Sequence, residues 1–229
     1  MKEAIVLAGG FGTRLQSVVK DLPKPMAPIN GKPFLTYIFD YLLKQGVEKV
    51  ILAVHYKKEI IINYYKDKYK EISIEYSIEN SPLLTGGAIK KALKLCKEDY
   101  VWIINGDTFF DTPLIDMANF ALDNKFCLTI ASKKMYNFSR YGKLIINNEC
   151  CIEKFEEKQY SEEGYINGGI YFIKSSLLNN FPEVFSLEND CFPILLRNNN
   201  IGVFKNDGYF IDIGIPDDYE KAINYFKEC

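Results

Sequence analysis

The 229-residue sequence contains a single histidine and no excess of basic residues. Lysine and arginine number 28 against 30 acidic residues, so the net charge is −2. Affinity for a polynucleotide comes mostly from Lys and Arg that displace counterions, so a nucleic acid partner is not expected. Because His55 is the only histidine, a three-histidine zinc site is excluded and a Ser-His-Asp triad could use only this residue. The chemistry must therefore depend on carboxylates, lysines and backbone amides.

Long apolar runs and paired cysteine motifs are also lacking. No apolar run approaches the ~20 residues that span a membrane, and the apolar start from Ala4 to Ala8 is shorter than the core of a signal peptide. The six cysteines lie at irregular spacings without a C-x-x-C motif, a pattern typical of free thiols in a reducing compartment. We therefore expect a cytoplasmic location and no membrane partner.

Short apolar runs alternate with segments of helical periodicity over most of the chain, which predicts an α/β fold with a largely parallel sheet covered on both faces. One such segment, 34–45, ends at Gly46, which is typical of a helix C-cap. We expect one domain, 1–229, with inserted strands and loops over about 136–166. The predicted strands are 3–7, 49–54, 72–77, 100–105, 127–131 and 170–173, and the predicted helices are 34–45, 87–97, 113–124, 184–198 and 216–228.

A glycine-rich motif follows the first predicted strand. Gly9, Gly10 and Gly12 lie between Leu7 and Leu15, and residues without a Cβ let main-chain N–H groups approach an anion closely. The motif predicts a phosphate cradle, although it lacks both the G-x-G-x-x-G fingerprint and a following Gly-Lys-Ser/Thr. The alternative is a glycine turn that only reverses the chain.

Lys24 lies between two prolines, Pro23 and Pro25, in the segment that follows this motif. Proline restricts the backbone and would hold the lysine in a fixed direction. We interpret Lys24 as a cation that faces a triphosphate, and the alternative is an ordinary solvated lysine.

A resemblance to a known family rests on the string from Ala8 to Phe34, AGGFGTRLQSVVKDLPKPMAPINGKPF. It resembles the nucleoside triphosphate:sugar-1-phosphate nucleotidyltransferases, and its length and sequence are most similar to the small D-glycero-α-D-manno-heptose 1-phosphate guanylyltransferases. The resemblance covers the whole chain and implies a Rossmann-like three-layer nucleotide-diphospho-sugar transferase fold with a mostly parallel, mixed sheet. It also implies transfer of a nucleotide, here GMP from GTP, to a sugar 1-phosphate with release of pyrophosphate.

Two aspartates each follow an apolar segment. Ligands of open α/β sheets bind beyond the carboxyl ends of the strands, which is where these aspartates are expected. Asp107 ends the sequence Asn105-Gly106-Asp107, and Asp212 lies in a second apolar segment before a predicted helix. Taken alone, Asn-Gly-Asp is as often a turn. The resemblance implies that Asp107 and Asp212 together hold Mg²⁺ on the α-phosphate, and oxygen ligands suit this hydrated ion.

The remaining binding residues also come from the resemblance. Phe155-Glu156-Glu157-Lys158 resembles the family's Phe-x-Glu-Lys motif, although Glu-Glu-Lys is also a routine solvated charge cluster. Arg140 precedes Tyr141 and Gly142, and the sequence leaves open whether it is only a surface charge. The expected sugar-binding residues are Tyr141, Gly142, Glu157, Asn167 and Gly168, and Lys158 is expected to contact the sugar phosphate. The expected nucleotide-binding residues are Leu7, Ala8, Gly9, Gly10, Gly12, Thr13, Glu79, Thr85, Gly86, Asn105 and Gly106.

Base choice depends on Glu79. A carboxylate accepts two hydrogen bonds side by side, and guanine offers adjacent N1–H and N2–H donors, whereas thymine and uracil offer one donor between two acceptors. Glu79 therefore favours GTP, unless it faces the ribose or solvent. The loop after it resembles the family's Pro-Leu-Gly-Thr-Ala-Gly segment, with Leu84 and Gly86 where Gly and Ala are usual.

The expected reaction needs no general base, because a sugar 1-phosphate is already anionic at neutral pH. Positioning and charge neutralisation by Arg14, Lys24, Lys158 and Mg²⁺ would then supply catalysis. The alternatives are a thymidylyl-, uridylyl- or cytidylyltransferase acting on glucose 1-phosphate, and a nucleotide-sugar binding module without catalysis. A glycosyltransferase is disfavoured because Asp107-Thr108-Phe109 lacks Asp-x-Asp. The sequence ends at Cys229 without the β-helix of longer relatives, and a homodimer is left open.

Overall fold

A computed structural model describes residues 1–10, 15, 19, 21–197 and 201–227. The expected phosphate-binding residues Gly12, Thr13 and Arg14 lie outside the described residues. Within the described part of the chain, ten strands form one mixed sheet in the order β11-β10-β12-β7-β1-β4-β6-β5, with β9 beside β12 and β13 beside β9. The strands are β1 (Glu3–Leu7), β4 (Lys49–Val54), β5 (Lys68–Tyr69), β6 (Ile72–Ile78), β7 (Tyr100–Asn105), β9 (Leu128–Phe138), β10 (Lys143–Ile146), β11 (Ile152–Glu156), β12 (Ser161–Lys174) and β13 (Ile201–Asn206).

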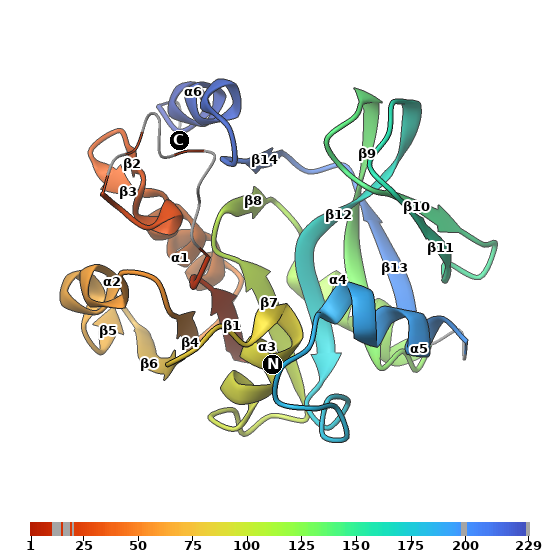
Figure 1. Ribbon diagram of the computed structural model, residues 1–229, viewed down its shortest axis with the longest axis horizontal. Helices are drawn as coiled ribbons and strands as arrows, with labels where there is room; N and C mark the ends of the chain where they lie inside the picture. The colour runs from red at the N-terminus through yellow and green to blue at the C-terminus, as the bar shows by residue number, and fades with distance from the viewer. Residues whose placement is uncertain (11–14, 16–18, 20, 198–200, 228–229) are drawn as a thin grey trace.

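The centre of the sheet is parallel. Strand β1 pairs in parallel with β4 on one side and β7 on the other, and β4 pairs in parallel with β6. Beyond β7, strand β12 runs antiparallel to both β7 and β9. Figure 1 shows this sheet crossing the molecule, with β6 at one side and β10 and β11 at the other. The parallel strands thus end along one edge, where a ligand can meet several of them.

Helices cover both faces of the sheet and create two cores. Ala4 and Val6 of β1 lie in the core that holds α1, α4 and α6, whereas Ile5 lies in the core that holds α3 and α5. Alternate residues of a strand face opposite sides, and each fully buried aliphatic side chain contributes about 1.5–3 kcal/mol. The expected three-layer α/β fold is confirmed. The α-helices are α1 (Phe34–Lys44), α2 (Lys58–Tyr65), α3 (Leu84–Leu93), α4 (Leu114–Asp123), α5 (Phe192–Leu196) and α6 (Pro216–Tyr225), with a short 3₁₀ helix, η2 (Lys24–Met26), and a short π-helix, η3 (Leu187–Cys191).

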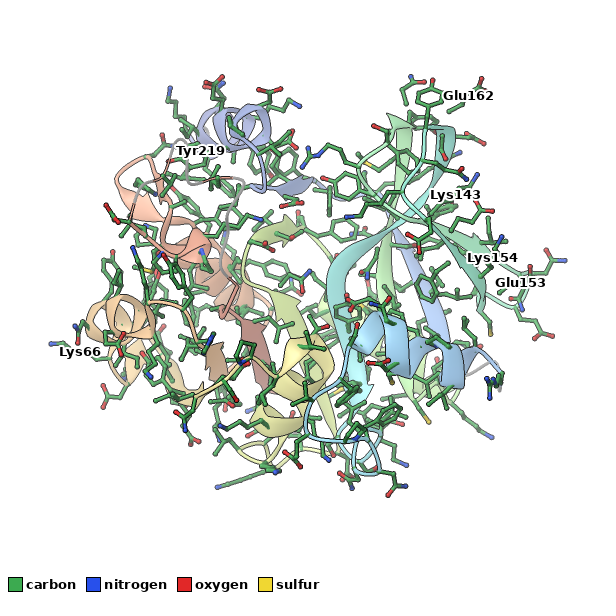
Figure 2. The ribbon with its side chains drawn as sticks, in the orientation of Figure 1. Lys66, Lys143, Glu153, Lys154, Glu162 and Tyr219 are labelled. Carbon is green, nitrogen blue, oxygen red and sulfur yellow. The ribbon has the colours of Figure 1, made fainter. Side chains whose placement is uncertain are left out.

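Two small antiparallel pairs lie outside the main sheet. Strand β2 (Pro28–Ile29) pairs with β3 (Lys32–Pro33), and β8 (Thr108–Phe110) pairs with β14 (Phe210–Asp212). The Tyr219 hydroxyl donates to the carbonyl of Pro28, which ties α6 to the first of these hairpins (Figure 2). None of the described helices is long and apolar enough to cross a membrane.

Several predicted elements match the structure closely. The predicted strands 3–7, 49–54 and 100–105 coincide with β1, β4 and β7. Gly46 follows α1 with a φ of +81°, as expected after a helix end. Helix α2 and strand β13 were not predicted, because neither segment has a long apolar repeat.

The expectation for the second half of the chain was partly wrong. The segments 127–131 and 170–173 belong to the long strands β9 and β12, so 136–166 contains the paired outer ends of these strands and the β10–β11 hairpin. Figure 2 shows Lys143, Glu153 and Lys154 on this outer hairpin. The predicted helix 184–198 starts late and is divided. Ser186 is extended and its hydroxyl accepts from Asn189 N, so helical structure starts only at Leu187. It then consists of η3 followed by α5.

Candidate functional site

A cavity of about 450 Å³ lies beyond the carboxyl ends of β1, β4 and β7. Leu7, Ala53 and Asn105 reach it from the strand ends, and the loop before α3 forms part of its wall. Among the nucleotide-binding residues expected from the sequence, its lining includes Leu7, Gly9, Gly10, Glu79, Thr85 and Asn105. The residue types and the position match a ligand site of an open α/β sheet.

Glycines at this edge serve close packing as well as access to the cavity. A Cβ on Gly9 would lie 3.3 Å from the backbone nitrogen of His55, whereas a Cβ on Gly10 would have no atom of the described residues within 4 Å. Gly106 does not line the cavity; its amide donates to the carbonyl of Leu7 at 2.9 Å, and a Cβ there would lie 2.6 Å from that oxygen. Gly106 therefore joins the ends of β1 and β7.

Backbone pairing brings the two aspartates together. In the β8–β14 pair, Asp212 lies opposite Thr108, and Ile213 N donates to Asp107 O at 3.1 Å. Lys24 Nζ donates to Asp107 Oδ2 at 2.6 Å and lies 3.4 Å from Asp212 Oδ1. The two carboxylates and the ammonium thus form one compact cluster at the cavity.

Lys24 occupies a restricted position, as the flanking prolines predict. It begins η2 after Pro23, and its side chain is only 10% exposed. The expectation that Lys24 faces phosphate differs from the structure in one respect, because its ammonium already contacts both aspartates. Gly214 leaves room for this cluster, since a Cβ there would lie 2.9 Å from Asp212 Oδ1.

Arg140 is not an isolated surface charge, which decides the alternative that the sequence left open. Its guanidinium donates to Asp218 and lies 4.0 Å from Asp212 Oδ2. Asp218, in the first turn of α6, also accepts from Lys221 at 2.9 Å. Burial raises the pKa of Asp218, but the hydrogen bonds from Lys221 and Arg140 outweigh it and hold that pKa below its usual value. An acidic residue after Pro216 is typical of an ordinary helix start, so the sequence offered no specific signal for this contact.

Asp212 experiences opposing influences. Burial is the largest cause that raises the pKa of Asp212, and the nearby charge of Asp107 raises this pKa further. The positive charges of Lys24 and Arg140 lower it. The pKa remains above its ordinary value. Two carboxylates held this close repel each other, and a cation between them relieves the repulsion.

Glu79 is fixed in the cavity wall from several directions. It is 6% exposed, its backbone N donates to Val54 O, and its Oε2 accepts from Leu83 N at 3.1 Å. His55 lines the same cavity, and its Nδ1 lies 3.0 Å from Glu79 O. The carboxylate of Glu79 has little freedom to turn towards solvent.

The loop after Glu79 differs in part from the expectation. Thr85 lines the cavity, but its hydroxyl also donates to Glu188 at 3.0 Å. Gly86 does not line the cavity, and a Cβ there would lie 2.3 Å from the ring of Phe185. Glycine is needed at this position because an aromatic ring packs against it.

The expected sugar-binding residues lie outside the lining of this cavity. Asn167 Nδ2 donates to Tyr171 OH at 2.8 Å, and a Cβ on Gly168 would lie 2.4 Å from the Phe110 ring. The Arg140 guanidinium carbon lies 5.5 Å from the centroid of the Tyr141 ring. Burial raises the pKa of the Tyr141 hydroxyl to about 12. Gly142 is packed closely as well, since a Cβ there would lie 2.8 Å from Glu156 O.

Glu157 and Lys158 follow β11 and are exposed, and no hydrogen bond or ion pair joins them to the described residues. The structure therefore does not bring this pair into the aspartate cluster through direct contacts.

A family model named Nucleotidyl transferase matches residues 3–228. The chain belongs to the nucleotidyl transferase family. Two similar members of this family carry the name D-glycero-alpha-D-manno-heptose 1-phosphate guanylyltransferase. The protein from Campylobacter jejuni subsp. jejuni is 48% identical over 226 residues, covering 95% of this chain and 96% of its own. The protein from Aneurinibacillus thermoaerophilus is 50% identical over 222 residues, covering 96% of both chains.

Two solved structures show the same architecture. The crystal structure of HddC from Yersinia pseudotuberculosis has a TM-score of 0.91 at 39% identity, covering 99% of this chain and all of that one. The HddC structure complexed with GMP-PN has a TM-score of 0.88 at 37% identity, with the same coverage. These similarities extend over nearly the whole chain and show that it shares this fold.

Proposed function

We propose that this nucleotidyl transferase transfers GMP from GTP to D-glycero-α-D-manno-heptose 1-phosphate, giving GDP-heptose and pyrophosphate. The observation that carries the proposal is a cavity lined by the buried carboxylate of Glu79 and by Lys24 and Asp107, with Asp212 held next to the cavity by Lys24. One group suits a guanine base and the other suits phosphates. The names of the similar relatives support both the base and the sugar.

The chemistry is an in-line displacement at the α-phosphorus of GTP. An oxygen of the sugar 1-phosphate forms a bond to this phosphorus, and the bond to the bridging oxygen of the β-phosphate breaks, so pyrophosphate leaves with the electron pair. The nucleophile is already anionic, so the chain need supply no general base. Lys24, next to Asn105 and Asp107 on the cavity wall, would neutralise charge on the phosphates, and Arg14 would assist from the glycine-rich motif.

The two aspartates fit a hydrated divalent cation. Lys24 Nζ already lies between Asp107 Oδ2 and Asp212 Oδ1, so the cluster attracts positive charge at a point next to the cavity. Mg²⁺ is bound by one or two carboxylates together with substrate phosphates and water. We infer that Asp107 and Asp212 hold Mg²⁺, which supplies additional charge neutralisation at the α-phosphate.

Glu79 would select the base. Its carboxylate is held by Leu83 N on one oxygen, and its Oε1 faces the glycine-rich segment, where it would lie 3.4 Å from a Cβ on Gly9. Each carboxylate oxygen has two lone pairs, so Glu79 can still accept the adjacent N1–H and N2–H of guanine. A thymine or uracil base would place a carbonyl against one of these oxygens.

The acceptor side rests on fewer contacts. We assign the sugar to Tyr141, Gly142, Asn167 and Gly168, with Glu157 on the hydroxyls and Lys158 on the sugar phosphate. Tyr141 supports this assignment, because it lies beside Arg140, whose guanidinium reaches Asp212. We further propose that residues 1–229 act as one domain. Whether the chain forms a homodimer is a separate question, which light scattering of the purified chain tests.

The test is a measurement of pyrophosphate release for a panel of NTPs crossed with sugar 1-phosphates. We expect GTP with heptose 1-phosphate to give the highest kcat/KM. A higher value for another NTP with glucose 1-phosphate would favour the thymidylyl-, uridylyl- or cytidylyltransferase alternative, and no release with any pair would leave a binding module. Asp107→Ala should abolish release while circular dichroism stays unchanged, and a wild-type rate in Mg²⁺ would refute the metal assignment.

A further inference from the structure

Leu84, the first residue of α3, has an unfavourable backbone conformation. Its φ is +61°, in the left-handed region where a Cβ approaches the following carbonyl oxygen. Asn and Asp tolerate this region because their short polar side chains form local hydrogen bonds, and Gly has no Cβ. Leucine has neither advantage, so the folded chain holds this residue against its local preference.

Burial of the side chain does not offset this strain well. Leu84 is 54% exposed, whereas Gly87, Ala88 and Ile89 of the same helix are buried. About half of the apolar surface of Leu84 is therefore exposed to water in the free protein. Strain of this kind is typical of functional sites, where a ligand uses the side chain.

The position of Leu84 indicates the ligand. It lines the cavity together with the apolar residues Pro82, Leu83 and Ala88, and the carboxylate of Glu79 lines the same cavity. The Leu83 amide, one residue before Leu84, donates to Glu79 Oε2 at 3.1 Å. The turn that places Leu84 in the left-handed region therefore also orients Glu79.

A purine base has hydrogen-bonding groups on its edge and apolar faces above and below the ring. We propose that Leu84 packs against one face of the guanine base while Glu79 binds its edge, so that Leu84 is a nucleoside-binding residue maintained at a cost to stability. This inference rests on the proposed function, because it takes the occupant of the cavity to be the base of GTP.

The inference predicts opposite effects on stability and binding. Leu84→Gly and Leu84→Asn should raise the Tm of the free protein by about 2 °C, because both residues tolerate a positive φ. Both should raise the Kd for GTP and for guanosine by about tenfold, because the apolar contact is lost. The Kd for inorganic tripolyphosphate should stay unchanged. Leu84→Met keeps an apolar side chain, so it should keep the wild-type Kd for GTP without a gain in Tm.

Lys125→Gly is the matched control for strain. Lys125 also has a positive φ, +58°, but it is exposed after α4 and does not line the cavity. This variant should raise the Tm by a similar amount without changing the Kd for GTP. Binding is measured by calorimetry without sugar 1-phosphate, so that no turnover occurs.

Three results would overturn the inference. If wild-type protein binds GTP and Leu84→Gly binds it equally well, Leu84 does not contact the base, and the proposed function is unaffected. If tripolyphosphate binding falls in parallel with GTP binding, the substitution acts through the loop as a whole. If wild-type protein binds no nucleotide, the proposed function fails and this inference fails with it.

Discussion

Replacing Arg140 by methionine removes a guanidinium that faces two acidic side chains. Arg140 donates to Asp218 and lies 4.0 Å from Asp212 Oδ2. Among the described residues, Asp218 would keep Lys221 as its only side-chain partner, and the side chain of Lys221 is largely exposed. A hydrogen bond to a charged group contributes about 1.5–3 kcal/mol, and the partial exposure of Arg140 favours the lower value. We therefore expect Arg140→Met to lose about 1.5–2 kcal/mol of unfolding free energy, or about 3–8 °C in Tm.

Denaturant unfolding of the wild type, Arg140→Met, Asp218→Asn and the double variant isolates this contact. The double-mutant cycle should give a coupling energy of about 1 kcal/mol or more. The contribution should also depend on pH, because the pKa of Asp218 is lower in the folded chain than in the unfolded one. It is therefore complete above the unfolded pKa and is lost as pH falls through the folded pKa. The difference in unfolding free energy between the wild type and Arg140→Met should therefore become smaller at acidic pH.

A coupling energy near zero, or a difference that stays constant in acid, would show that Arg140 does not stabilise the chain through Asp218. Lys154→Met provides the control. Lys154 is an exposed residue of β11 whose Nζ lies 3.7 Å from Glu156. Because an exposed ion pair contributes about 0–1 kcal/mol, this variant should unfold nearly as the wild type does.

Three further substitutions test the packing and the charges of the cavity. Gly86→Ala should destabilise the fold by about 1–3 kcal/mol, because its Cβ would overlap the ring of Phe185. Gly10→Ala should keep the wild-type Tm, because no atom of the described residues lies within 4 Å of the added Cβ. Equal Tm values for both variants would contradict the packing argument. Asp212→Asn should raise the Tm of metal-free protein at neutral pH, because the folded state raises the pKa of Asp212 and therefore disfavours its charged form. This gain should disappear as pH falls through that pKa, and thermal scans in EDTA across acidic and neutral pH measure it. Glu79→Gln should lower the ratio of kcat/KM for GTP over ATP by about tenfold or more, since a guanine donor then faces an amide N–H donor; an unchanged ratio would exclude Glu79 from base recognition.

Local sequence predicted the elements whose signals are continuous along the chain. Strands β1, β4 and β7 are apolar runs of adequate length, and α1 has an apolar face and a terminal glycine, so their ends could be placed closely. The long strands β9 and β12 were underestimated because their outer halves carry polar residues on both faces. Their extent depends on pairing with each other, which a local pattern does not contain.

The same difference separates the candidate site residues that the sequence predicts from those that it does not. Lys24, Glu79, Asp107 and Asp212 were identified from motifs, and the structure brings all four to one cavity or its rim. The sequence does not indicate a role for Arg140, because its partner Asp218 in α6 lies 78 residues further along the chain.

The sequence by itself determined the family, the α/β class and the chemical groups available for the reaction, because these depend on residue types and short motifs. Only the tertiary structure decided how those groups meet. The pairing of β8 with β14 brings Asp212 to Asp107, and Lys24 then lies between two carboxylates as well as at the cavity. The turn before α3 likewise forces Leu84 into a left-handed conformation at the cavity wall. These arrangements arise from contacts between segments far apart in the chain, and their energies have no counterpart in any local window of sequence.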